Sequence, residues 1–77
     1  MKVSGLLVGG LRELAGLDDK TVLLDDPSLR KAADLLPLLR LPHGIVGLAM
    51  CGGRQLDWDD DLAEGMEITL YSLVGGG

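Results

Sequence analysis

A single amphipathic segment lies between two groups of short strand candidates, and this order limits the folds open to the chain. In residues 27–36 the apolar side chains recur at the i, i+3, i+4 and i+7 positions of a helix. These positions are Leu29, Ala32, Ala33 and Leu36. Asp26 followed by Pro27 is typical of a helix start, and Pro37 disfavours continuation. We therefore expect one principal helix from Pro27 to about Leu36, with its apolar stripe facing a sheet.

Five segments are rich in β-branched or aliphatic residues and are bounded by turn residues. They are Lys2–Val8, Thr21–Leu24, Ile45–Met50, Arg54–Trp58 and Met66–Tyr71. Gly52-Gly53 predicts a tight hairpin, and residues 11–15 predict one helical turn closed by Gly16. Asp60 or Asp61 is a candidate cap for a further short turn.

The order β, β, α, β, β, β fits an α+β fold of the β-grasp (ubiquitin-like) type. In this arrangement a mixed sheet of about five strands is covered on one face by one principal helix. The first and last strands run parallel at the centre of the sheet. The last strand then leads directly towards the C-terminus.

Length and charge exclude several classes of function. A chain of 77 residues is expected to form one domain, too small for a deep active-site cavity beside its core, so it is not expected to be an enzyme. The net charge of −5 disfavours nucleic-acid binding and favours a partner with a basic face. No apolar run has the length of a membrane span, and no N-terminal signal segment is recognisable, so we expect a cytoplasmic protein.

The sequence ends in Val74-Gly75-Gly76-Gly77. We expect a β-grasp domain over residues 1–74 and a flexible glycine tail over residues 75–77. Four extended residues span at most ~14 Å, enough to carry a terminal carboxylate into the active site of another protein. The alternative is a frayed chain end with no role.

Two segments resemble the prokaryotic ubiquitin-like sulfur carriers, namely the small subunit of molybdopterin synthase and the thiamine-pathway sulfur carrier. Residues 65–77, with the strand pattern Glu67-Ile68-Thr69-Leu70-Tyr71 before the terminal glycines, resemble the closing segment of that family. Residues 11–16, Leu-Arg-Glu-Leu-Ala-Gly, resemble the molybdopterin-synthase branch more closely. Met66, Cys51 and Gly75 depart from the family pattern.

The resemblance implies a non-catalytic sulfur carrier with no bound cofactor or metal. An E1-like activating enzyme would use ATP to adenylate the terminal carboxylate, and a sulfur donor would convert the adenylate into a thiocarboxylate. A larger synthase subunit or another enzyme would accept the sulfur, most simply for molybdopterin. The alternatives are the thiamine pathway and a ubiquitin-like protein modifier joined through the same glycine.

The implied site lies at the end of the chain. Gly77 would carry the adenylate and the thiocarboxylate, and Gly76 would keep the tail thin. Side chains of the last strand, with Leu6 or Val8 of the first, would form a docking surface on the sheet face away from the helix. The partner-binding residues are expected to be Gly75, Val74, Leu73 and Tyr71. The alternative for the side chains of the last strand, Tyr71 in particular, is that they close the core.

Three other features are better explained as structural. His43 has no neighbour in sequence that suggests catalysis, and Cys51 is most simply a small hydrophobic residue beside a hairpin. The acidic run from Asp57 to Glu64 lacks the ligand spacing of a calcium loop, so we expect a solvated loop, with steering of a basic partner as the alternative. A lone cysteine without paired cysteine and histidine ligands also excludes a structural zinc site.

Overall fold

The computed structural model describes residues 1–73, which form a five-stranded mixed sheet in the order β2-β1-β5-β3-β4. The strands are β1 (Lys2–Leu7), β2 (Thr21–Asp25), β3 (Val46–Cys51), β4 (Arg54–Leu56) and β5 (Glu67–Ser72). β1 and β5 are parallel at the centre, and the other neighbouring pairs are antiparallel. The β-grasp fold expected from the element order is confirmed.

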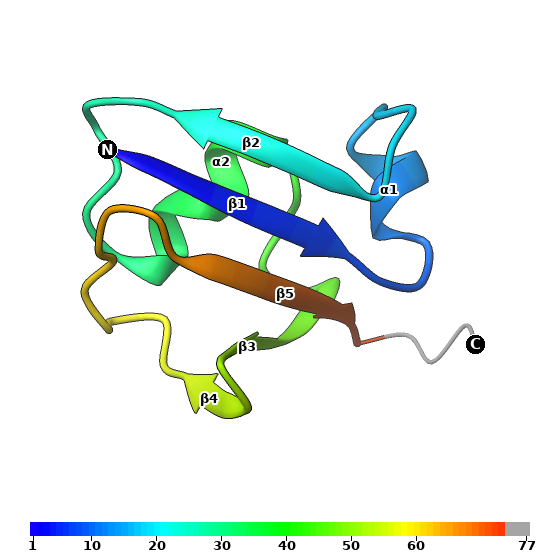
Figure 1. Cartoon of the computed structure of the whole chain (residues 1–77). Helices are drawn as coiled ribbons and strands as arrows, with labels where there is room; N and C mark the ends of the chain where they lie inside the picture. The colour runs from blue at the N-terminus through cyan, green and yellow to red at the C-terminus, as the bar shows by residue number, and fades with distance from the viewer. Residues whose placement is uncertain (74–77) are drawn as a thin grey trace.

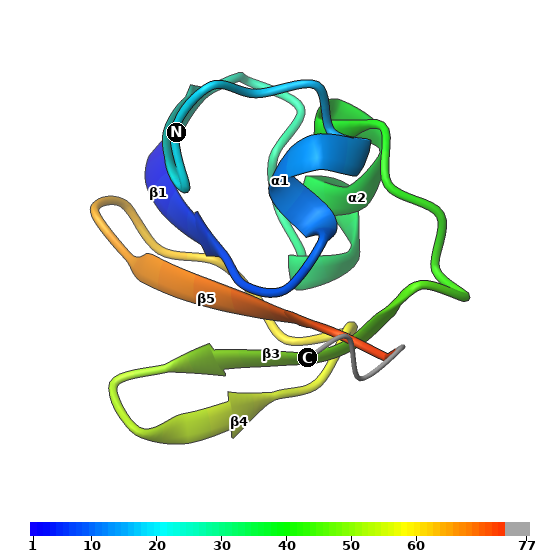
Figure 2. The same ribbon diagram turned by 90° about the vertical axis from the view of Figure 1, so that its right-hand side faces the viewer.

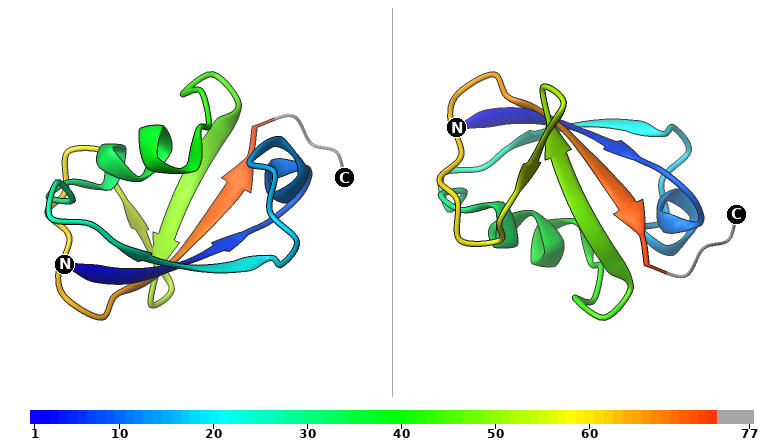
Figure 3. Two further views of the ribbon diagram at one scale, coloured as in Figure 1. Left: turned by 90° about the horizontal axis from the view of Figure 1, so that it is seen from above. Right: turned by 90° about the horizontal axis from the view of Figure 1, so that it is seen from below.

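One face of the sheet is covered and the other is open. Figure 1 looks onto the open face, with α2 (Leu35–Leu39) behind the sheet, and Figure 3 shows the two layers from above and below. The short helix α1 (Leu11–Leu14) lies at the end of the sheet where β1 and β5 terminate (Figure 1), on the same side of the sheet as α2 (Figure 2). The core between the layers is entirely aliphatic. Its largest fully buried side chains are Leu7, Leu11, Leu35, Leu36, Ile68, Leu70 and Val3.

The turns follow their local chemistry. Gly52 and Gly53 have φ angles of 59° and 78°, and a type I′ turn in a two-residue hairpin requires positive φ at both positions. Gly16, which follows the C-cap residue Ala15 of α1, has a φ of 73°, so the expected glycine stop is confirmed. The expected strands are also confirmed, with ends shifted by one or two residues.

The predicted position of the principal helix, from Pro27 to about Leu36, is wrong. A 3-10 turn occupies Ala32–Asp34 and continues into α2, so the helical segment begins five residues late and ends three residues beyond Leu36. Pro37 lies in the first turn of α2, where a missing N–H costs no intrahelical hydrogen bond. Leu29, Ala32 and Leu36 are buried as expected, but Ala33 is only half-buried.

Tertiary pairing explains the late start. The N–H groups of Ala32 and Ala33 donate to the C=O groups of Asp60 and Trp58, and Leu62 N–H donates to Arg30 C=O. Residues 30–33 therefore bond with the loop before β5 instead of forming a first helical turn. Asp26 does accept a hydrogen bond from Ser28 N–H at 2.7 Å, yet the turn that it closes does not lead into a helix.

The loop between β4 and β5 contains turns and no helix. Asp60 accepts a hydrogen bond from Asp57 N–H at 2.9 Å, and Asp61 pairs with Lys31 Nζ at 2.8 Å. Neither aspartate therefore caps the short turn expected through Leu62 and Ala63, because Asp60 closes the preceding turn and Asp61 forms an ion pair with a residue distant in sequence. Among residues 1–73, no helix is long and apolar enough to cross a membrane.

Candidate functional site

The candidate site begins where β5 leaves the centre of the sheet. β5 runs between β1 and β3, and its last residue, Ser72, is in register with Val46. Leu73 N–H then donates to Ile45 C=O at 2.6 Å, so the backbone remains held by the β3 side for one residue beyond the strand. This contact fixes the position from which the chain continues to Val74.

Two glycines make room for this exit. A Cβ on Gly9 would lie 2.9 Å from Ser72 Cβ, closer than real carbon atoms pack. A Cβ on Gly47 would lie 3.0 Å from Leu73 Cδ1 and 3.1 Å from Leu73 Cα. Gly9 and Gly47 thus flank the end of β5, and neither was assigned this role from the sequence. Only the strand order, which places β1 and β3 on the two sides of β5, reveals it.

An apolar band lies on the open face near this exit. We define the band as the exposed or half-buried side chains Leu6, Val8, Leu48, Met50, Tyr71 and Leu73. Tyr71 lies opposite Leu48 in the β3–β5 register, and Val8 N–H donates to Leu70 C=O beside it. Tyr71 is 39% exposed and Leu73 is 63% exposed, so neither side chain is needed to close the core.

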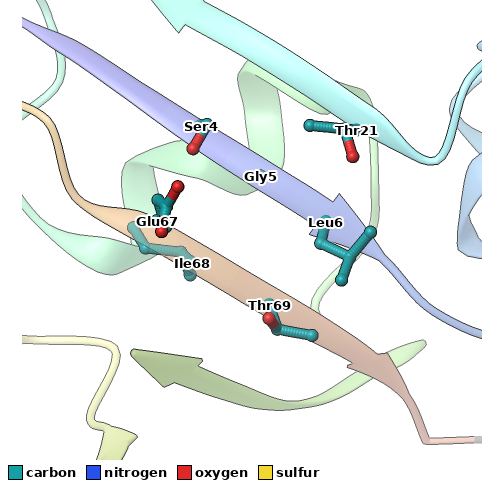
Figure 4. A pocket seen from close by; sticks show the side chains of 7 residues that line it. All are labelled: Ser4, Gly5, Leu6, Thr21, Glu67, Ile68 and Thr69. Atoms are coloured by element: carbon teal, nitrogen blue, oxygen red, sulfur yellow. The ribbon is translucent and has the colours of Figure 1, made fainter. Parts of the chain in front are cut away.

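The rest of the open face is more polar. A shallow hollow of about 260 Å³ lies between the middle of β1 and the start of β5. Figure 4 shows its lining: Ser4, Gly5, Leu6, Thr21, Glu67, Ile68 and Thr69. Three hydroxyl groups and one carboxylate contribute to this lining beside Leu6, whereas the apolar band carries no charged side chain. The open face is therefore divided along β5, with its apolar part towards the chain exit.

Two cations lie at the margin of the apolar band. Arg12 and Lys20 line a second hollow of about 290 Å³ together with Leu6, Leu7, Val8 and Gly9. The Arg12 guanidinium also donates to the C=O groups of Leu17 and Asp18, at 3.1 Å and 3.3 Å. Much of its hydrogen-bonding capacity is thus used within the fold. The Arg12 guanidinium also lies 3.7 Å from a carboxylate oxygen of Glu13, so its charge is partly compensated locally.

The carboxyl groups with lowered pKa values accept hydrogen bonds within the fold and lie away from the exit. Asp34 accepts hydrogen bonds from the N–H groups of Lys31 and Arg30, which lower the pKa of its carboxyl group. The hydrogen bond from Lys31 likewise lowers the pKa of Asp61, and the same pair raises the pKa of Lys31. The hydroxyl and N–H of Ser28 lower the pKa of Asp26. Each of these shifts reflects a hydrogen bond that stabilises the charged form.

The residues expected to be structural take structural positions. His43 makes an edge-on ring contact with Trp58, with the ring centres 5.7 Å apart. Cys51 is half-buried and packs against the core. Within residues 1–73, no group of three or more metal-ligating side chains is close enough to hold an ion.

The structure places Tyr71 and Leu73 at the exposed end of β5, as the docking hypothesis requires. The side chains of Leu6 and Val8 are also exposed there. The remaining expected site residues, Val74, Gly75, Gly76 and Gly77, lie outside the described residues. The expected boundary between domain and tail at residue 74 lies there too.

Comparisons with known proteins agree on the fold. No protein-family model matches the sequence, and no curated protein matches it significantly. Among solved structures, a Pyrococcus furiosus protein described as molybdopterin converting factor subunit 1 matches with a TM-score of 0.74 and 19% identity, covering 96% of this chain and 99% of its own. Small archaeal modifier protein 1 from Haloferax volcanii matches with a TM-score of 0.72 and 22% identity over 100% of both chains.

A third solved structure, the HVO 2177 protein of Haloferax volcanii, matches with a TM-score of 0.72 and 18% identity. The match covers 100% of this chain and 87% of the other. At these identities the likeness concerns the fold. The chain thus shares the complete β-grasp fold of a molybdopterin converting factor subunit and of an archaeal modifier protein.

Proposed function

We propose that this chain is a ubiquitin-like sulfur carrier whose Gly77 carboxylate is activated by a partner enzyme. The observation that carries the proposal is the combination of a full-length β-grasp fold with a glycine triplet that follows its central strand β5 within three residues. The match to a molybdopterin converting factor subunit supports this carrier role. Molybdopterin is accordingly the favoured destination of the sulfur, with the thiamine pathway as an alternative.

The chemistry needs two partners. A carboxylate oxygen of Gly77 attacks the α-phosphorus of ATP, forming an acyl-adenylate and releasing pyrophosphate. A persulfide R–S–SH of a sulfur donor then attacks the acyl carbon, and AMP leaves. A thiol attacks the donor sulfur of the resulting acyl disulfide, which releases the thiocarboxylate and leaves the thiol and the donor joined as a disulfide. Because an acyl-adenylate hydrolyses readily, it must form in a pocket that excludes water. The side-chain-free residues Gly75 to Gly77 suit a narrow pocket.

The apolar band supplies the docking surface in this proposal. Exposed apolar side chains beside a reactive chain end are typical interface anchors. Tyr71→Ala or Leu73→Ala should weaken binding to the activating enzyme by about tenfold or more, with the free energy of unfolding nearly unchanged. Leu14→Ala, which truncates an exposed leucine of α1, is the matched control and should leave binding unchanged. If Leu73→Ala instead unfolds the domain, Leu73 is not a docking residue.

The test of the proposal is ATP–pyrophosphate exchange with the activating enzyme of the native host, followed by intact-mass measurement. The wild-type chain should support exchange and then gain the mass of one oxygen-to-sulfur replacement. Deleting Gly77 should abolish both steps, since it withdraws the carboxylate by about 3.5 Å, and ~1 Å can already cost about 10²-fold. Adding one residue after Gly77 should be equally damaging. Normal exchange and thiolation by either variant would refute the carrier function.

A protein modifier is the second candidate, because the chain also matches small archaeal modifier protein 1. A modifier requires the same activation but a lysine amine as the final acceptor. Immunoblots of host extract against this chain distinguish the two functions. Slower-migrating conjugates that disappear when Gly77 is deleted would favour the modifier, and a free thiocarboxylate without conjugates would favour the carrier.

A further inference from the structure

The strand β2 forms a free edge of the sheet on the side remote from β4. It is the outermost strand in the order β2-β1-β5-β3-β4, and Figure 1 shows no other strand beyond it. β2 has five residues, whereas the opposite edge strand β4 has three. A short edge strand is one common way in which proteins protect an edge from pairing. Of the two edges, β2 is therefore the one suited to accept another strand.

The direction of the backbone groups follows from two hydrogen bonds at the ends of β2. Leu7 N–H donates to Lys20 C=O at 2.8 Å, and Asp26 N–H donates to Met1 C=O at 3.1 Å. In an antiparallel strand the direction of the backbone N–H and C=O groups alternates from one residue to the next. These groups therefore point towards β1 in the even-numbered residues of this stretch and away from β1 in the odd-numbered ones. The N–H and C=O groups of Thr21, Leu23 and Asp25 consequently point outward. Within residues 1–73 these groups have no hydrogen-bond partner.

The side chains of β2 are also incompletely covered. Leu23, at the middle of the strand, is 70% exposed on the open face. Val22 and Leu24 face the helices but are only half-buried, since no strand lies beyond them. A hollow of about 310 Å³ lies along this edge, lined by Leu17, Asp18, Asp19, Thr21, Val22 and Leu23. An added strand would cover both leucines and place a side chain in this hollow.

Acidic pairs lie at both ends of β2. Asp18 and Asp19 precede it, Asp25 and Asp26 end it, and Lys20 is the only cation between them. Residues 18–26 carry four aspartates and one lysine, so antiparallel pairing with a second copy would bring two net-negative edges together, although Lys20 would lie opposite Asp26 in the register about Leu23. Such like charges repel across an interface. The charge pattern instead complements a segment with basic residues at both ends.

We propose that the β2 edge binds an extended segment of a partner protein as a sixth strand. The segment has β-branched or apolar residues at alternate positions over about five residues, flanked on each side by Lys or Arg. Pairing with the main chain of Thr21, Leu23 and Asp25 supplies the affinity, as in other cases of strand addition. The flanking cations next to the aspartates fix the register. This surface is separate from the apolar band and does not depend on the proposed function.

The experiment uses the full chain and the synthetic peptide Lys-Arg-Val-Thr-Val-Thr-Val-Arg-Lys, capped at both ends. Amide hydrogen exchange is measured by NMR with and without about 1 mM peptide. The amides of Thr21, Leu23 and Asp25 should exchange rapidly in the free protein and about tenfold or more slowly with peptide. The amides of Val22 and Leu24, which already face β1, should change much less. This alternation distinguishes strand pairing from contact with the side chains alone.

Three controls isolate the backbone and the charges. The same peptide with its central valine N-methylated lacks one donor and should bind at least about fivefold more weakly. A peptide with Glu in place of Lys and Arg should bind more weakly still. Leu23→Pro removes the central outward N–H without breaking a bond to β1, so it should fold and lose binding, whereas Leu23→Thr should retain the alternating protection. If Leu23→Pro does not fold, the double variant Asp18→Asn with Asp25→Asn tests the charges. It should bind the basic peptide more weakly than the wild-type chain does.

Several results would overturn the proposal. One is the absence of alternating protection at about 1 mM peptide. Another is equal binding of the acidic and basic peptides. A third is alternating protection that grows with protein concentration in the absence of peptide, because the edge would then pair with a second copy of this chain.

Discussion

Replacing Gly9 by alanine tests the packing at the exit of β5, and Gly10 provides a matched control one residue away. Gly9 has a φ of 75°, in the left-handed region, and its Cβ would lie 2.9 Å from Ser72 Cβ. Gly10 has a φ of −84°, and a Cβ there would meet nothing within 4 Å. The same chemical change is thus made in two neighbouring residues with opposite surroundings.

The magnitude has three parts. A left-handed conformation costs a residue with a Cβ about 1–2 kcal/mol. The contact with Ser72 adds to this cost, because carbon atoms prefer separations of about 3.5–4.0 Å. Alanine also restricts the unfolded chain, which returns about 0.4–1 kcal/mol. We therefore expect Gly9→Ala to lower the free energy of unfolding by about 1–3 kcal/mol.

Gly10→Ala gains the same stabilisation, because alanine restricts the unfolded chain there too. It loses only the slight preference for glycine before α1, about half a kcal/mol. Its net effect should be close to zero. The two variants should therefore differ by about 2 kcal/mol, which corresponds to roughly 10 °C in Tm for a domain of this size.

Urea denaturation followed by circular dichroism measures the difference, provided that the slope of the transition is the same in both variants. NMR shifts of the Ser72 and Leu73 amides in Gly9→Ala should report the displacement of the chain exit. If the unfolding free energies of Gly9→Ala and Gly10→Ala agree within about 0.5 kcal/mol, Gly9 neither is held left-handed nor limits the path of Ser72.

Two further predictions concern the covered face and the acid range. Leu36→Ala should cost about 2–5 kcal/mol in urea denaturation, because Leu36 is 1% exposed, whereas Leu38→Ala, at 36% exposed, should cost clearly less; equal costs would contradict the inward face of α2. Since hydrogen bonds lower the pKa of Asp34 in the folded state, its stabilisation is complete above the ordinary value of 3.8 and is lost as the pH falls through the lower folded pKa. Asp34→Asn should therefore reduce the stability at neutral pH and flatten its acid dependence, and an unchanged pH profile would show that these hydrogen bonds do not stabilise the fold.

Local chemistry in the sequence determined most of the fold. Alternating and aliphatic runs specified the five strands, and residues that favour positive φ, such as Gly16 and the Gly52-Gly53 pair, specified where elements end. The inward positions of Leu29, Ala32 and Leu36 also followed from spacing alone. Tyr71 and Leu73 could be nominated for the face away from the helix from their places on the last strand, but only their exposure in the structure separated this from a role in closing the core.

The tertiary structure decided what depends on contacts between distant segments. The helix starts late because residues 30–33 bond with the loop around Trp58 and Leu62, a pairing that no local pattern indicates. Gly9 and Gly47 gained their role only when the strand order placed them beside the end of β5. The outward backbone groups of β2 likewise follow from its edge position. Sequence periodicity specifies which way a side chain points within one element, but the neighbouring element is set by the packing of the whole chain.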